Sequence, residues 1–96
     1  MTPEKKVQLL AILDSIVAEL TKLGVWDMSE AELEGTFLGT LRFGMIPGIK
    51  ARLGGEHPLP PESNLGVFAV REFDGQDAFQ DLSSLLSEFD WVYNNG

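Results

Sequence analysis

The chain contains no cysteine, which excludes disulfide bridges, thiolate nucleophiles and the common zinc sites built on cysteine. It has a single histidine, and no apolar run approaches the roughly 20 residues that a membrane-spanning helix needs. The first apolar stretch is interrupted by Gln8, Asp14 and Glu19, which is typical of an amphipathic helix and not of an export signal. We therefore expect a cytoplasmic protein without disulfides and without a membrane segment.

Basic residues are also scarce, especially in the second part of the chain. Seven Lys and Arg stand against fifteen Asp and Glu, for a formal net charge of −8, and residues 56–96 hold eight acids against Arg71 alone. Direct nucleic-acid binding is disfavoured, because it depends on neutralising phosphates with Lys and Arg. The acidic surface can serve a basic partner, or it can simply keep a small protein soluble.

The chain does have enough apolar material for one core. It is 96 residues long and 44% hydrophobic, so it falls near the usual size of a single domain. We expect one domain over residues 1–96, with an all-α fold: a bundle or array of four to five helices.

Two segments carry a clear helical period. The first begins with Thr2 as a cap and Pro3 at the first helical position, repeats leucine and isoleucine every three or four residues, and ends at Gly24. The second carries apolar residues at the same steps over residues 79–93, and residues 94–96 are expected to fray. These two helices are predicted to anchor the fold.

The middle of the chain is less regular. Ser29 and Glu32 have the spacing of a capping box that starts a second helix, but several glycines after it weaken that helix. The spacing of Gly35 and Gly39 favours either close helix packing or fraying. Because Pro47 lacks an N–H, residues 36–53 form one kinked helix or two helices joined near residues 44–48.

A third segment of regular structure is expected before the last helix. Ser63 or Asn64 can cap a short helix that carries Leu65 and Phe68, although residues 67–73 could also form a short strand. Both interpretations stay open at this point.

No arrangement of residues points to catalysis. His57 is the one ordinary candidate for a base, but it lies beside Pro58 in a loop and belongs to no H-x-x-x-H pair and no nucleophile elbow. The paired acids at residues 30/34 and 77/81 share a helix face and are expected to be solvated. We predict no enzymatic activity, no cofactor and no metal.

Two groups of residues are candidates for binding. Trp91 falls off the apolar stripe of the last helix, so it packs on another helix or is exposed as an anchor for a protein partner. The other members of this first group are Asp77, Asp81 and Asp90. The second group, an alternative site for a small anionic ligand, consists of Trp26, Arg42, Lys50, Arg52 and His57.

The order of several motifs resembles the YqcC-like family of small bacterial proteins. The motifs are Trp26, Ile46-Pro47, Pro58-Leu59-Pro60, Leu85-Leu86 and Phe89-Asp90. The resemblance implies an all-helical cytoplasmic protein, and gene neighbourhood associates the family with tRNA pseudouridine synthase. This chain is shorter than the family after the tryptophan, and Gly48 stands where the family usually has an arginine, so no role of that arginine carries over.

These observations lead to one main hypothesis and one alternative. The main hypothesis is a non-enzymatic protein-interaction module, with the role of an acidic accessory to a basic RNA-modifying enzyme as one form of it. The alternative is a domain that binds a small anionic ligand. The sequence specifies no oligomeric state.

Overall fold

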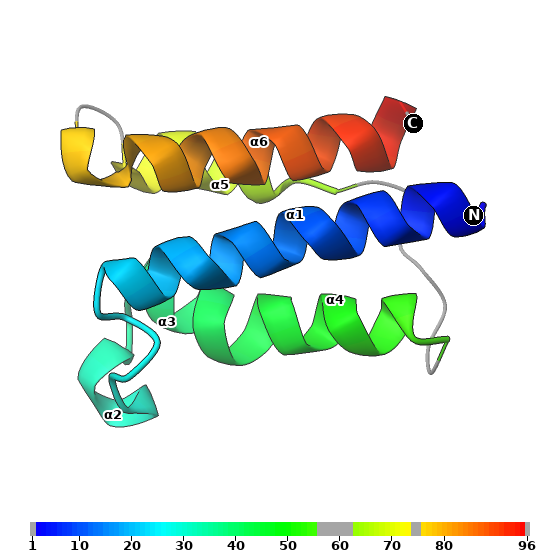
Figure 1. Cartoon of the computed structure of the whole chain (residues 1–96). Helices are drawn as coiled ribbons and strands as arrows, with labels where there is room; N and C mark the ends of the chain where they lie inside the picture. The colour runs from blue at the N-terminus through cyan, green and yellow to red at the C-terminus, as the bar shows by residue number, and fades with distance from the viewer. Residues whose placement is uncertain (1, 56–62, 74–75, 96) are drawn as a thin grey trace.

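The computed structural model describes residues 2–55, 63–73 and 76–95, and within these ranges the chain is all-α with no strand (Figure 1). The predicted fold class is confirmed. The α-helices are α1 (Pro3–Lys22), α2 (Glu30–Leu33), α3 (Phe37–Gly39), α4 (Ile46–Leu53), α5 (Leu65–Phe73) and α6 (Gln80–Asn95). A π-helical segment, η1 (Thr40–Met45), joins α3 to α4, and a 3₁₀ turn, η2 (Asp77–Phe79), precedes α6.

The long helix α1 lies in the middle of the bundle. It packs against α6 on one side and faces the α3–η1–α4 run on the other (Figure 1). Helix α6 runs antiparallel to α1 and also carries α5. Helix α5 therefore sits at the margin of the bundle, with α6 as its main neighbour.

The ends of α1 are those that the sequence predicts. The Thr2 hydroxyl oxygen accepts a hydrogen bond from the backbone N–H of Lys5 at 3.2 Å, and Pro3 is the first helical residue. Gly24 takes a φ of +81° just after the helix, a conformation that glycine adopts without a steric penalty.

The capping box is also confirmed, but the helix that it starts is short. Ser29 accepts from the Glu32 N–H at 3.2 Å and donates its own N–H to the Glu32 carboxylate at 3.4 Å. Helix α2 nevertheless ends at Leu33, because Gly35 turns the chain with a φ of +80°. Thr36 then caps the next helix by accepting from the Gly39 N–H at 3.1 Å.

Residues 37–53 form one continuous helical run, which answers the question of one helix or two. The change near Pro47 is one of hydrogen-bond pattern: in η1 the Ile46 N–H donates to the Leu41 carbonyl, five residues back. A regular α-helix would bring the Pro47 ring against the carbonyl of Phe43, four residues earlier. The wider π turn directly before Pro47 is consistent with relief of that clash.

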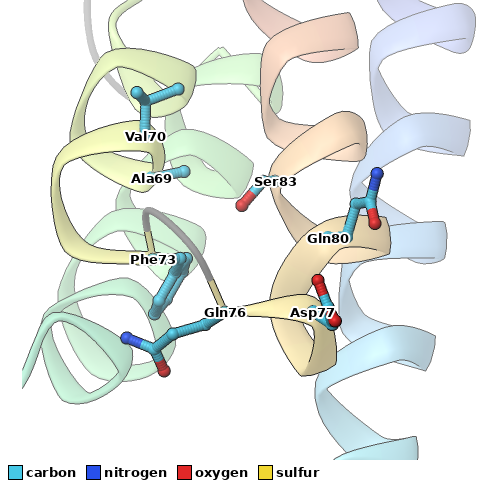
Figure 2. Close-up of a pocket in the computed structure, with 7 residues that line it drawn as sticks. All are labelled: Ala69, Val70, Phe73, Gln76, Asp77, Gln80 and Ser83. Carbon is cyan, nitrogen blue, oxygen red and sulfur yellow. The ribbon is translucent and has the colours of Figure 1, made fainter.

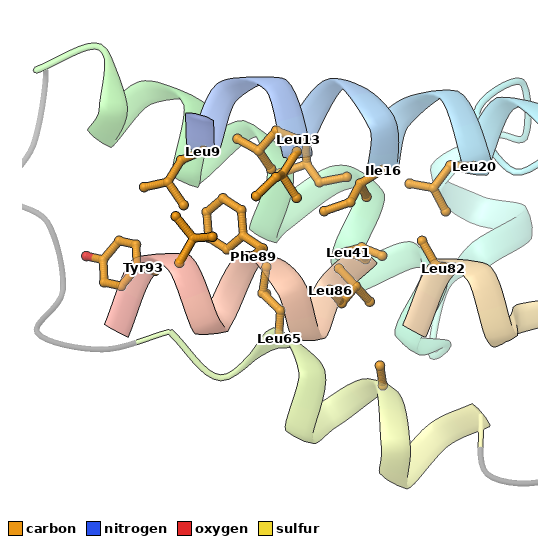
Figure 3. Close-up of a cluster of buried hydrophobic side chains, with 14 of the residues drawn as sticks. Leu9, Leu13, Ile16, Leu20, Leu41, Leu65, Leu82, Leu86, Phe89 and Tyr93 are labelled. Carbon is orange, nitrogen blue, oxygen red and sulfur yellow. The ribbon is translucent and has the colours of Figure 1, made fainter. Parts of the chain in front are cut away.

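The core lies between α1 and α6 and is completed from α3–α4 and α5 (Figure 3). The stripe predicted for α1 is buried, and Leu82, Leu86 and Phe89 of α6 face it. An aromatic cluster closes one end, where the Phe73 ring lies 5.3 Å from Phe37 and 4.5 Å from Phe79 between centroids. The buried residues of α1 are Leu9, Ile12, Leu13, Ile16 and Leu20.

Tyr93 closes the other end of the core and gives the fold a pH dependence. Burial raises the pKa of the Tyr93 hydroxyl above its usual value of about 10, and the positive charge of Arg52 lowers it by a smaller amount. Folding therefore favours the protonated phenol. Its contribution to stability is complete below pH 10 and is lost as the pH rises through the higher pKa of the folded state.

We therefore expect the free energy of unfolding to fall above pH 10 more steeply in the wild type than in Tyr93→Phe. Urea unfolding of both proteins between pH 8 and pH 11 measures the difference, and the other titrating groups are common to both. If the free energy of unfolding falls equally with pH in both proteins, the Tyr93 hydroxyl does not contribute to the pH dependence of stability.

Candidate functional site

Trp91 is exposed, which decides between the two predictions made for it. Its side chain is 66% exposed on the outer face of α6. Two valines of α5 are similarly open, Val67 at 59% and Val70 at 61%. Large apolar side chains grouped in this way on a small protein are typical of an interaction surface.

These side chains border a groove between α5 and α6, which we call the α5–α6 groove. Near the end of α6 it opens into a hollow of about 410 Å³ that is lined by Gly66, Val67, Val70, Ser87, Asp90 and Trp91, among others. A second hollow of about 270 Å³ lies near the end of α5 and is lined by Ala69, Val70, Phe73, Gln76, Asp77, Gln80 and Ser83 (Figure 2). Because Val70 lines both hollows, they are consecutive parts of one groove.

The groove is shallow because the two helices approach closely at Gly66. A Cβ atom at this position would lie 2.7 Å from the Ser87 hydroxyl oxygen and 2.9 Å from the Ser87 Cα. No side chain larger than hydrogen fits there without moving the helices apart. Gly66 thus sets the distance between α5 and α6.

Asp90, a residue of α6, caps the start of the neighbouring helix α5. One carboxylate oxygen accepts from the Ser63 hydroxyl at 2.6 Å and from the Leu65 N–H at 2.9 Å, while the other accepts from the Gly66 N–H at 2.6 Å. The free N–H groups at the start of a helix are ordinarily capped by a residue next to it in sequence. Here the capping residue is 24 to 27 residues away in sequence. Asp90, which was predicted to bind a partner, therefore has a structural role that no sequence pattern near α5 indicates.

Asn94 adds a second tie at the same junction. Its side-chain oxygen accepts from the Ser63 N–H at 2.9 Å, and its side-chain nitrogen donates to the Ser63 carbonyl at 3.1 Å. Helix α6 continues to Asn95. The prediction that residues 94 and 95 fray is therefore wrong, because this pair of hydrogen bonds holds the last turn in place.

The other two predicted acids, Asp77 and Asp81, differ in their position relative to the groove. Asp77 lines the hollow at the end of α5, and Asp81 is exposed on α6. Glu88, which sequence reasoning missed, is exposed seven residues after Asp81 and three before Trp91, so all three share one side of α6. Within the described residues, no hydrogen bond or ion pair engages the side chains of these acids. Asp77 lines the groove, whereas Asp81 and Glu88 line neither hollow and are exposed on the side of α6 that carries Trp91. We call these three acids the acidic border.

The alternative ligand site is partly assembled, through stacking. The guanidinium carbon of Arg42 lies 3.5 Å from the centroid of the Trp26 ring and 4.8 Å from that of Phe43. The Arg42 Nε is buried and has no hydrogen-bond partner among the residues that the structure describes. Trp26 and Arg42 thus meet, as a ligand site would require, but the aromatic rings occupy the faces of the guanidinium.

The remaining basic residues do not converge on Arg42. Lys50 and Arg52 follow it by eight and ten residues in the same helical run, which places them about 12 Å and 15 Å along the axis. Both are exposed. His57 lies outside the described residues. The three cations Arg42, Lys50 and Arg52 are therefore spread along one helix.

A third hollow of about 300 Å³ lies beside α2 and η1. Its lining includes Phe43 and Thr36, and its rim carries Glu30 and Glu34, the acid pair that the sequence predicts to be solvated. Both acids are exposed. No group of three or more His, Asp or Glu residues able to hold a metal occurs in the described ranges.

The described helices include none with the length and apolar character needed to cross a bilayer. The resemblance to the YqcC-like family stays a prediction from the sequence motifs, and one of those motifs, Pro58-Leu59-Pro60, lies outside the described residues. No protein-family model, curated protein or solved structure matches this chain.

Proposed function

We propose that this protein is a non-enzymatic interaction module of the cytoplasm that binds a protein partner through the α5–α6 groove. The observation that carries the proposal is the exposure of Trp91 beside Val67 and Val70. Tryptophan is enriched among the few residues that dominate binding energy at protein interfaces. An exposed tryptophan at the wall of a groove is well placed to be such an anchor.

The side chains around the groove support binding more than catalysis. Asp90, the acid next to Trp91, has both oxygens occupied by hydrogen bonds to Ser63, Leu65 and Gly66. A carboxylate held in this way is a structural acceptor and is poorly placed to exchange protons with a substrate. The other side chains along this part of the groove come from two valines, two serines, two asparagines and the tryptophan.

An acidic accessory to a basic RNA-modifying enzyme is one form of this proposal, prompted by the gene neighbourhood of the family that the sequence resembles. It is supported by the net charge of −8 and by the acidic border, both of which favour a basic protein. The partner would supply the RNA contacts, because this chain has too few basic residues to neutralise phosphates.

A photo-crosslinking amino acid placed at Ser84 tests the proposal. Ser84 is exposed on α6, seven residues before Trp91 and on the same side of the helix. When the producing cells are illuminated, this variant is expected to crosslink a discrete partner, identified by mass spectrometry. Adding Trp91→Ala should reduce the crosslinked yield by about tenfold, the equivalent of roughly 1.4 kcal/mol of lost binding.

The matched control carries the crosslinker at Ser15, an exposed serine on α1. Trp91→Ala should leave the thermal midpoint nearly unchanged, because truncation of an exposed side chain usually alters stability by less than about 0.5 kcal/mol. Equal crosslinked yields from Ser15 and Ser84 would refute the α5–α6 groove as the binding surface. So would a yield from Ser84 that Trp91→Ala leaves unchanged while the protein stays folded.

A further inference from the structure

Helix α5 has an apolar side that no part of the described chain covers. Leu65, Ala69 and Phe73 are buried toward the bundle, yet Val67 and Val70 on other sides of the same helix are 59% and 61% exposed. Arg71 and Glu72 of the same helix are exposed and charged. Even so, a helix with apolar residues on more than one side is ordinarily covered by more than one neighbour. Within the bundle α5 packs mainly on α6. The sequence of α5 is therefore suited to a second helical neighbour.

The dimensions of the α5–α6 groove fit such a neighbour. Val67 lines one hollow and Phe73 the other, and six residues of helix separate them by about 9 Å. Residues i and i+7 of an α-helix lie on one side and about 10.5 Å apart. Two apolar side chains with this spacing would reach both hollows. Small residues on the groove floor, Gly66, Ala69, Ser83 and Ser87, let the incoming helix approach closely.

Charge identifies the kind of helix that fits. The described residues of the α5–α6 unit carry five acids and one base, Arg71. Asp77 lines the groove, and Asp81 and Glu88 are exposed on the Trp91 side of α6. None of the three has an ion pair within the described residues. A second copy of this chain would bring the same net charge of −8, so like-charge repulsion opposes self-association. Lysine and arginine on the flanks of the incoming helix would meet these carboxylates.

We propose that the α5–α6 groove receives an amphipathic helix of a partner protein, with apolar residues at i and i+7 packed into the two hollows and Lys or Arg along its flanks. This inference rests on the proposed function and adds the form and the charge of the partner. Trp91 forms the wall of the groove against which the helix packs, and the acidic border selects for positive charge.

Selection from a displayed library of 18-residue peptides, randomised without bias toward helix or charge, tests the inference against the full-length chain. Selected peptides are expected to carry net positive charge and apolar residues at helical spacing. Their Kd should weaken at least tenfold with Trp91→Ala and about threefold with Asp81→Asn and Glu88→Gln combined. It should also weaken as sodium chloride rises from 50 to 500 mM, because salt screens the charge pairs.

Two matched controls separate the groove from general apolarity and charge. Val7→Ala removes an apolar side chain of α1 that is 67% exposed, about as much as Trp91. The double variant Glu30→Gln with Glu34→Gln removes two exposed acids that are distant in sequence from α5 and α6. Neither should change the Kd by more than twofold. Circular dichroism confirms that every variant is folded.

The outcomes distinguish this inference from the proposed function. Peptides that are acidic or proline-rich and extended, yet lose affinity with Trp91→Ala, would overturn the basic helix and leave the groove as a binding surface. A dimer seen by light scattering and dissociated by Trp91→Ala would overturn it in favour of a second copy. Selected peptides that all bind regardless of Trp91→Ala, or no binders, would count against both.

Discussion

Replacing Asp90 with alanine is expected to lower the free energy of unfolding by about 3 kcal/mol and the thermal midpoint by about 15 °C. Three hydrogen bonds to the carboxylate disappear, two of them from the Leu65 and Gly66 N–H groups at the start of α5. Hydrogen bonds to a charged group are stronger than neutral ones, and loss of a helix cap alone costs about 1 kcal/mol. Urea and thermal unfolding followed by circular dichroism measure the change.

Asp81→Ala is the matched control, because it removes an exposed acid from the same helix and should change stability by less than about 0.5 kcal/mol. Asp90→Asn should fall between the two, since an amide keeps one oxygen acceptor but turns an N–H₂ toward the other donors. Equal, small losses for Asp90→Ala and Asp81→Ala would mean that the cap at α5 does not stabilise the fold.

Gly39→Ala is expected to lower the free energy of unfolding by about 2 kcal/mol. A Cβ at Gly39 would collide with the carbonyl oxygen of Leu33. That oxygen belongs to the backbone and already accepts from the Thr36 N–H and hydroxyl, so it cannot move freely. The clash should outweigh the gain of about 1 kcal/mol that alanine ordinarily brings to a helix.

Gly44→Ala is the companion variant, because the backbone at Gly44 is also helical and a Cβ there meets no atom within 4 Å. It should raise stability by about 0.5–1 kcal/mol. Chemical unfolding of both variants under one condition gives the comparison. If the free energy of unfolding changes in the same direction in Gly39→Ala and Gly44→Ala, the predicted clash with the Leu33 carbonyl is wrong.

The role of Asp90 also changes how the partner surface can be studied. Loss of Asp90 should loosen α5, and with it Val67 and Val70, so a binding defect in that variant would report misplacement of the groove. Trp91 and Asp81 are exposed, and within the described residues no side-chain hydrogen bond ties them to another helix, which makes them the informative positions. Of the four residues predicted to bind a partner, Asp90 is the one tied into the fold.

Much of the fold could be predicted because the signals are local. Thr2 and Gly24 bound α1, and Ser29 and Glu32 form the predicted capping box, through contacts that span a few residues. The apolar stripe of α6 is likewise buried at the predicted positions from Leu82 to Tyr93. A pattern of this kind acts within one or two turns of helix, so it is visible in the sequence itself.

Only the tertiary structure decided the features that depend on residues distant in sequence. The sequence allowed α5 to be a helix or a strand, and the structure shows a helix whose cap, Asp90, comes from α6. The sequence made Arg42 a candidate for an anion site, and in the fold it stacks on Trp26, sixteen residues away. Trp91 was placed off the apolar stripe by its spacing, but its exposure beside Val67 and Val70 results from where α5 packs on α6. Local periodicity defines which side of a helix is apolar, whereas the packing of helices decides which apolar side stays uncovered.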